Sequence, residues 1–77
     1  MAITVKYFAS MRERIGRAED ALDTDGLHTV GEVWARVAPT EALPGNVLMA
    51  VNQEYADPSH PVRDGDEVAF FPPVTGG

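Results

Sequence analysis

The sequence has no cysteine in its 77 residues. Disulfides, thiolate nucleophiles and persulfides held on a side chain are therefore excluded. The two histidines, His28 and His60, lie far apart in the sequence, and neither belongs to a cluster with metal-ligand spacing. No Ser/His/Asp constellation with a supporting motif, no GxGxxG sequence and no Walker-type loop occurs. We therefore expect no metal site, no bound cofactor and no enzyme that acts alone.

Basic residues are scarce: six lysines and arginines stand against twelve acidic residues, which gives a net charge of −6. Such a surface repels phosphate backbones and anionic lipids, so we expect neither a nucleic-acid partner nor a membrane partner. No segment approaches the roughly eighteen apolar residues that span a bilayer. The start, MAITVKYFAS, lacks the basic and apolar regions of a signal peptide. We expect a cytoplasmic protein.

Alternating side chains predict a strand near each end of the sequence. In residues 3–9 the alternation sets Ile3, Val5 and Tyr7 on one face and Thr4, Lys6 and Phe8 on the other. In the last strand it sets Val68 and Phe70 on one face and Ala69 and Phe71 on the other. Pro72 and Pro73 cannot donate hydrogen bonds to a sheet, so strand pairing should end there.

Two helices are predicted from capping signals. Ser10 and Glu13 have the spacing of a capping box before a stop at Gly16, which predicts a short helix. Thr29 and Glu32 have the same spacing and precede a stripe at helical intervals, Val30, Val33, Trp34, Val37 and Ala38. Pro39 limits this main helix to about ten residues. We expect Trp34 to lie in the core.

The segments between these elements complete the fold. Residues 17–26 predict a short edge strand or an irregular segment, and residues 47–56 one strand whose apolar first half is covered on both faces. Asp64-Gly65 predicts a turn before the last strand. The order of elements indicates an α+β roll, a small mixed sheet crossed by one main helix. We expect a domain at residues 1–73 and an extended functional tail at residues 74–77.

The tail has a composition suited to insertion into a partner. Pro72 and Pro73 favour an extended chain, and Val74 and Thr75 resist helix formation. Gly76 and Gly77 have no side chains, so a partner can enclose their backbone tightly. The tip then presents the α-carboxylate of Gly77, which adenylation can activate. A chain without cysteine can carry sulfur there as a thiocarboxylate.

Three segments resemble the small sulfur-carrier subunit of molybdopterin synthase: AVNQ at residues 50–53, HPVRDGDEVAFFPPVTGG at residues 60–77, and YFASMRERIG at residues 7–16. The resemblance covers nearly the whole chain and is poorest at residues 17–24 and 38–46. It implies the ubiquitin-like β-grasp fold.

The resemblance also implies a function. Gly77 would be adenylated with ATP by a ubiquitin-activating-like adenylyltransferase and converted to the thiocarboxylate. Val74, Thr75, Gly76 and Gly77 would thread into the larger catalytic subunit and deliver sulfur to cyclic pyranopterin monophosphate. The catalytic lysines would belong to that larger subunit, in a heterotetramer of two large and two small subunits. This chain would carry sulfur without catalysing the reaction.

Strand alternation suggests where the partner docks. We expect Phe8, Tyr55, Phe71 and Pro73 to form an apolar patch beside the root of the tail, because exposed patches of this kind mark interfaces. Arg12 is expected to pair with acidic groups of the partner. The alternative is that Tyr55 and Phe71 pack in the core.

Other functions remain open from the sequence. A sulfur carrier for thiamine thiazole synthesis shares the fold and the glycine ending, although FFPPVTGG and FASMRERIG favour the molybdopterin pathway. A ubiquitin-like modifier would join Gly77 to lysines of other proteins. A plain binding module would leave the two glycines inert.

Overall fold

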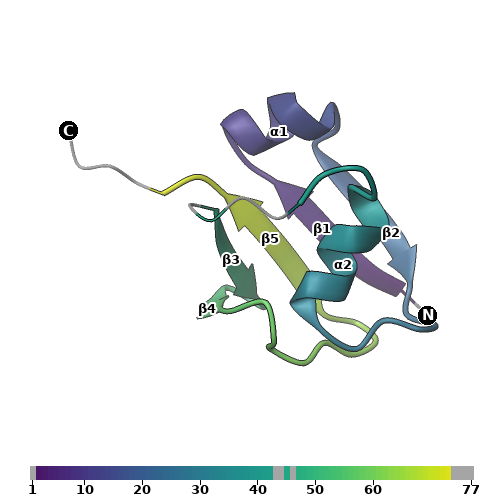
Figure 1. Cartoon of the computed structure of the whole chain (residues 1–77). Helices are drawn as coiled ribbons and strands as arrows, with labels where there is room; N and C mark the ends of the chain where they lie inside the picture. Colours follow the sequence, from purple (N-terminus) through teal and green to yellow (C-terminus); the bar gives the residue numbers. More distant parts are fainter. Residues whose placement is uncertain (1, 43–44, 46, 74–77) are drawn as a thin grey trace.

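A computed structural model describes residues 2–42, 45 and 47–73. The described elements run in the order β1 (Ala2–Tyr7), α1 (Ser10–Ile15), β2 (Glu19–Asp23), α2 (Val30–Val37), β3 (Leu48–Val51), β4 (Glu54–Ala56) and β5 (Glu67–Phe71). Figure 1 shows the strands side by side in one sheet, with α2 lying across one face. None of the helices in the described ranges is long and apolar enough to cross a membrane.

The sheet is mixed. Its strands pair in the order β2-β1-β5-β3-β4, with β5 in the middle. The first and last strands, β1 and β5, pair in parallel with Val5 opposite Val68, whereas the other neighbours pair antiparallel. A mixed sheet crossed by one main helix confirms the expected α+β, ubiquitin-like β-grasp roll.

The core lies between the sheet and α2. The predicted strand faces are confirmed, because Ile3, Val5, Val68 and Phe70 are all completely buried. The indole ring of Trp34 meets the ring of Phe70 edge to face, with centroids 5.1 Å apart. Aromatic pairs in this geometry add about 1 kcal/mol to the burial of their area. Trp34 is therefore a core residue, as expected.

Helix α2 begins at the predicted capping box. Glu32 N donates to the Thr29 hydroxyl at 3.3 Å, and the Glu32 carboxylate accepts from the backbone N–H groups of Thr29 at 3.0 Å and His28 at 2.7 Å. The bond from His28, followed by that from Thr29, lowers the pKa of Glu32. The backbone of Gly31 also donates to the Pro58 carbonyl at 2.9 Å. A Cβ on Gly31 would lie 3.2 Å from that oxygen, so a larger residue here would push the Pro58 carbonyl back by a few tenths of an ångström.

Helix α1 begins differently from the prediction. The capping box of Ser10 and Glu13 is wrong, because Ser10 is already helical and the N-cap is Ala9, without a side-chain cap. Ala9 has φ 53° and ψ −127°, a conformation that L-residues rarely adopt. The predicted stop at Gly16 is confirmed: it has φ 88°, and its N–H donates to the Arg12 carbonyl.

Residues 47–56 form two strands where one was predicted. Asn52 and Gln53 have φ values of 51° and 69°, which is the conformation of a tight hairpin turn between β3 and β4. The expected burial of residues 47–51 is confirmed except at Leu48, which is half-buried. Met49 and Val51 belong to the core cluster, whereas Ala50 is buried on the side of the sheet that no described helix covers.

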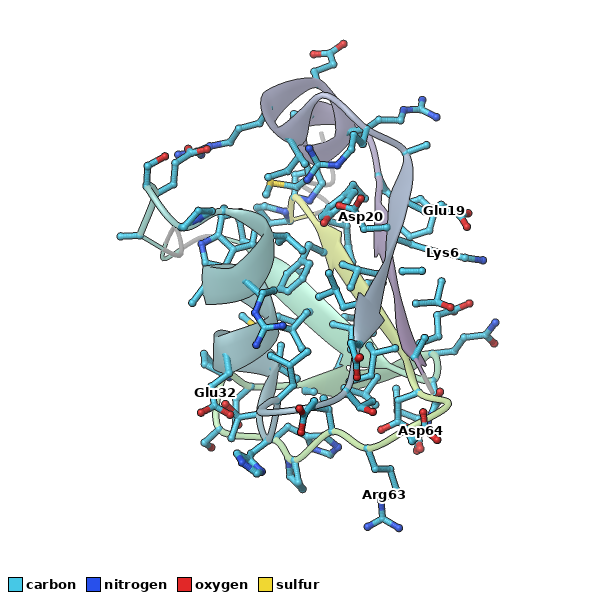
Figure 2. The ribbon with its side chains drawn as sticks, turned by 90° about the vertical axis from the view of Figure 1, so that its right-hand side faces the viewer. Lys6, Glu19, Asp20, Glu32, Arg63 and Asp64 are labelled. Carbon is cyan, nitrogen blue, oxygen red and sulfur yellow. The ribbon has the colours of Figure 1, made fainter. Side chains whose placement is uncertain are left out.

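Strand β2 is the predicted short edge strand. A hydrogen bond across the helix side of the sheet ties it to β1: the Tyr7 hydroxyl donates to Asp20 Oδ2 at 2.9 Å. Arg17 Nε donates to both oxygens of the same carboxylate, at 2.9 and 2.8 Å. Burial, then the bond to Asp20, raises the pKa of Tyr7 far above its ordinary value. In Figure 2 Asp20 lies inside this edge of the sheet, while Glu19 and Lys6 point away from α2.

Candidate functional site

The tail begins where the central strand ends. β5 pairs with β3 as far as Phe71, which lies opposite Leu48. Pro72 and Pro73 follow directly, and without N–H groups they cannot extend the ladder. The predicted threading residues Val74, Thr75, Gly76 and Gly77 lie outside the described residues, as does the predicted domain-tail boundary beyond Pro73. Their roles therefore stay predictions.

Beside the root of the tail, the face of the sheet opposite α2 is hollowed. This sheet-face hollow has a volume of about 360 Å³ and is lined by Lys6, Phe8, Ala50, Gln53, Tyr55, Glu67, Ala69 and Phe71. Phe8 is 49% exposed and Tyr55 is 76% exposed. The ring of Phe71, which is half-buried, lies 5.9 Å from the ring of Tyr55. The alternative that Tyr55 packs in the core is excluded by this exposure.

The register of the sheet explains the hollow. Lys6 lies opposite Ala69, Ala69 opposite Ala50, and Ala50 opposite Tyr55, so these side chains form one row across four strands. The two alanines in the middle have short side chains and form a low floor. Aromatic rings stand around it, because Phe8 and Phe71 follow Lys6 and Ala69 by two residues on the same face.

The rim of the hollow is polar on one side. Lys6 Nζ lies 3.1 Å from Glu67 Oε1, and both side chains are about one-third exposed. Asn52 Oδ1 accepts from the backbone N–H of Glu67 at 3.0 Å, which fixes the turn beside it. Sequence reasoning missed Lys6, Gln53, Glu67 and the two alanines of this site. The Asn-Gln pair within AVNQE was the signal for the turn that brings Gln53 to the rim.

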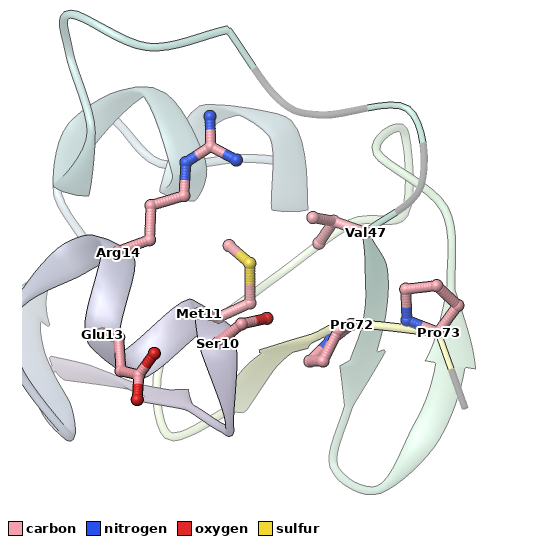
Figure 3. A pocket seen from close by; sticks show the side chains of 7 residues that line it. All are labelled: Ser10, Met11, Glu13, Arg14, Val47, Pro72 and Pro73. Carbon is pink, nitrogen blue, oxygen red and sulfur yellow. The ribbon is translucent and has the colours of Figure 1, made fainter. Parts of the chain in front are cut away.

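A second hollow lies on the other side of the tail root (Figure 3). This tail-root hollow has a volume of about 450 Å³ and is lined by Ser10, Met11, Glu13, Arg14, Val47, Pro72 and Pro73. Pro73 therefore lies here rather than in the sheet-face hollow, where the sequence had grouped it with the aromatic residues. Arg14 closes one wall of the tail-root hollow through an ion pair with Glu41, Nε to Oε1 2.8 Å.

Arg12 is exposed on α1. Its side chain forms no hydrogen bond or ion pair with the described residues, in contrast to Arg14 and Arg17, which pair with Glu41 and Asp20. A guanidinium without an internal partner has its donors available to an acidic group of another protein.

The side chains that line the two hollows can form contacts with another molecule. In the described part of the chain, no group of three or more His, Asp or Glu side chains gathers closely enough to hold a metal ion. The aromatic rings, alanines and single ion pair of the sheet-face hollow offer apolar contact with a polar edge, the usual composition of an interface. The described surface therefore presents an exposed aromatic face next to the point where the sheet ends at Pro72 and Pro73.

Known proteins resemble this chain both in sequence and in fold. The chain is 44% identical to the molybdopterin synthase sulfur carrier subunit of Escherichia coli, over 97% of this chain and 99% of the relative. It is 37% identical to the subunit of the same name from Chlamydomonas reinhardtii, over the full length of both. The crystal structure of SAMP1 from Haloferax volcanii superposes with a TM-score of 0.78 at 29% identity, over all of both chains.

A further solved structure is a complex of subunits 1 and 2 of molybdopterin-converting factor from Helicobacter pylori. It matches with a TM-score of 0.68 at 26% identity, again over all of both chains. The model of the ThiS family matches residues 5–77, which include the lining of the sheet-face hollow and the tail. With this match and these full-length relatives, the chain belongs to the ThiS family.

Proposed function

We propose that this protein is the sulfur carrier subunit of a molybdopterin synthase. The full-length relatives from Escherichia coli and Chlamydomonas reinhardtii, which bear that name, support the assignment. The observation that carries it is the position of the tail root. The most enclosed strand of the sheet, β5, ends in Pro72-Pro73 beside an exposed aromatic face, so a rigid element delivers the tail next to a docking surface.

The proposed chemistry takes place on Gly77. Its α-carboxylate attacks the α-phosphate of ATP on a ubiquitin-activating-like adenylyltransferase, which gives an acyl adenylate and releases pyrophosphate. A sulfur donor then displaces AMP, so that sulfur replaces one carboxylate oxygen and a thiocarboxylate results. This route needs no thiol on the carrier, which agrees with a sequence without cysteine. The carrier binds no cofactor of its own.

The proposed partner is the larger subunit of the synthase. Phe8, Tyr55 and Phe71 dock on it through the sheet-face hollow, and Arg12 pairs with acidic groups at the edge. Pro73 directs the tail, and Val74, Thr75, Gly76 and Gly77 thread into the active site of the larger subunit.

There the thiocarboxylate gives its sulfur to cyclic pyranopterin monophosphate, and the catalytic residues belong to the larger subunit. The Helicobacter pylori complex of subunits 1 and 2 supports such a pair, and two pairs would form the heterotetramer. The cytoplasmic location stays a prediction.

Intact mass tests the carrier chemistry. The protein is incubated with its adenylyltransferase, ATP and a sulfur donor, and its mass is measured before and after. We expect an increase equal to one oxygen replaced by sulfur, located on the fragment that ends in Gly77. No shift with an enzyme that demonstrably forms the adenylate would contradict the proposal. Addition of the larger subunit and the pterin precursor then separates the molybdopterin pathway from a thiamine thiazole carrier.

A second function is supported by the structural likeness to small archaeal modifier proteins, with a TM-score of 0.77 at 28% identity for a second solved structure from Haloferax volcanii. As a modifier, the chain would form an isopeptide bond between Gly77 and a lysine of another protein. The readout is a ladder of higher-mass adducts in cell extract, which a sulfur carrier does not produce.

A further inference from the structure

Gln53 lies at the rim of the sheet-face hollow, and its side chain forms no hydrogen bond with the described residues. It is the second residue of the turn between β3 and β4, and its side chain is exposed. It lines the sheet-face hollow together with Tyr55 and Phe71, and a smaller hollow together with Asn52 and Glu67. Its position is therefore next to the face on which we propose that the partner docks.

The backbone of Gln53 is strained. Its φ of 69° lies in the left-handed region, which glycine adopts freely and other L-residues at a cost of roughly 1–2 kcal/mol. Turns of this type strongly favour glycine at the second position, as in Asn-Gly. A glutamine here lowers the stability of the turn compared with the residue that the conformation prefers.

Asn52 lies in the same turn and also has a positive φ, but its side chain is hydrogen-bonded within the fold. Asparagine tolerates this region better than glutamine, and both the nitrogen and the oxygen of its carboxamide form hydrogen bonds. Nδ2 donates to Asp66 Oδ1 at 3.0 Å, and Oδ1 accepts from the N–H of Glu67 at 3.0 Å. The Gln53 carboxamide forms no comparable hydrogen bond with the described residues, so nothing in this part of the fold offsets its strain. Strain that persists without an internal benefit points to function.

The chemistry of the rim indicates what Gln53 binds. A carboxamide offers one acceptor and two donors without charge, which matches the C=O and N–H of a peptide group. The charged groups of the same rim, Lys6 and Glu67, are already paired with each other at 3.1 Å. The floor of Ala50 and Ala69 beside it accepts apolar side chains. The rim thus fits a partner segment with apolar side chains over the floor and its main chain at the edge.

We infer that the Gln53 carboxamide hydrogen-bonds to a main-chain peptide group of the larger synthase subunit docked on this face. This inference rests on the proposed function and deepens it, because it adds a binding residue that exposure of aromatic rings alone does not identify. Gln53 is held at the rim by the turn, with its carboxamide free of internal partners in the described structure. The strained backbone of Gln53 places that amide at the interface.

The test is the variant Gln53→Gly in the full-length protein. Relief of the positive φ should raise Tm by about 3 °C. Loss of the carboxamide should weaken binding to the purified cognate larger subunit by about fivefold to tenfold, measured by calorimetry. If Gln53 had only a structural role, the rise in Tm would come without weaker binding, because a variant that folds more stably should bind the larger subunit at least as well.

Three further variants separate the effect of backbone strain from the effect of losing the carboxamide. Ala9→Gly also relieves a positive φ and removes no polar group, so Tm should rise while Kd stays within about twofold. Gln53→Glu keeps the shape of the side chain and removes its donors, so it should also weaken binding. Phe71→Ala serves as the positive control for docking on this face.

The outcomes separate this inference from the proposed function. Wild-type affinity for Gln53→Gly and Gln53→Glu, together with weak binding by Phe71→Ala, would overturn the inference and leave the docking face in place. An unchanged or lower Tm for Gln53→Gly would also overturn it, because the strain would then be absent. No binding of the larger subunit by the wild-type chain would overturn both.

Discussion

The ring of Tyr55 lies beside the ring of Phe71, with centroids 5.9 Å apart and planes inclined by 47°. The two residues belong to strands that are not neighbours, because β3 lies between β4 and β5. Ala50 of β3 stands opposite both Tyr55 and Ala69, and its short side chain leaves room for the rings to meet above it. The exposed aromatic face therefore depends on a small residue at the centre of the sheet.

Tyr55→Ala should weaken binding of the larger subunit by tenfold or more with almost no change in Tm. The ring is 76% exposed in the free protein, so its removal costs the fold little, whereas buried aromatic anchors dominate interface energies. Phe71→Ala should weaken binding similarly with a small loss of stability. Calorimetric titration and thermal unfolding check both effects. Tyr55→Phe is the matched control and should bind nearly as well, and equal binding by Tyr55→Ala would refute the docking face.

Addition of one residue after Gly77 should abolish sulfur delivery and leave folding intact. The added residue moves the activated carboxylate away from the position that glycines allow the partner to enclose. The measurement is molybdopterin formation in a reconstituted synthase, with thermal unfolding as the control for the fold. Normal product formation by the extended protein is incompatible with the carrier mechanism.

Tyr7→Phe should lower the free energy of unfolding by about 1 kcal/mol at neutral pH, because the hydrogen bond to Asp20 is lost. It should also flatten the alkaline limb of the stability curve. The pKa of Tyr7 is raised in the folded state, so the unfolded chain loses this proton first as the pH rises above the ordinary value of 10.0. The contribution of Tyr7 is therefore complete below pH 10 and declines above it. Urea titrations between pH 7 and pH 11 measure the difference, and parallel curves for the two proteins would contradict it.

Ala9→Gly should stabilise the protein by about 1 kcal/mol. The N-cap of α1 has φ 53° and ψ −127°, a region that glycine enters without the clash of a Cβ. The matched control is Ala35→Gly at an exposed position inside α2, which should destabilise by about 0.5–1 kcal/mol because glycine is a poor helix former. The midpoints of urea unfolding report both changes. A loss of stability in Ala9→Gly would show that this backbone is not strained.

Local chemistry made several elements predictable from the sequence. The alternation of Ile3, Val5 and Tyr7 identified the buried face of β1, and the Thr29–Glu32 spacing identified the start of α2. Pro72 ended the last strand because it lacks an N–H group. Each of these signals acts within a few residues of its own position. The candidate face was partly predictable for the same reason, since strand alternation placed Phe8 and Phe71 away from the core.

Other features escaped prediction because long-range contacts decide them. The capping box expected at Ser10 was replaced by a strained turn at Ala9, where the chain passes from β1 into α1. The strand expected through residue 56 breaks at Asn52, whose side chain bonds to residues 14 and 15 positions further along the chain. Pro73 was expected among the aromatic rings but lies in the hollow beside α1.

The sequence by itself determined the family, whose model matches residues 5–77, and it led to the proposed carrier chemistry through the absence of cysteine, the Pro72-Pro73 pair and the Gly76-Gly77 pair. These are properties of residue type and order, and they do not depend on packing. Only the tertiary structure decided which side chains become neighbours on the proposed docking face, because its row of Lys6, Ala69, Ala50 and Tyr55 comes from four strands. Register between strands is fixed by the core on the opposite face, so which residues become neighbours here depends on the whole sheet.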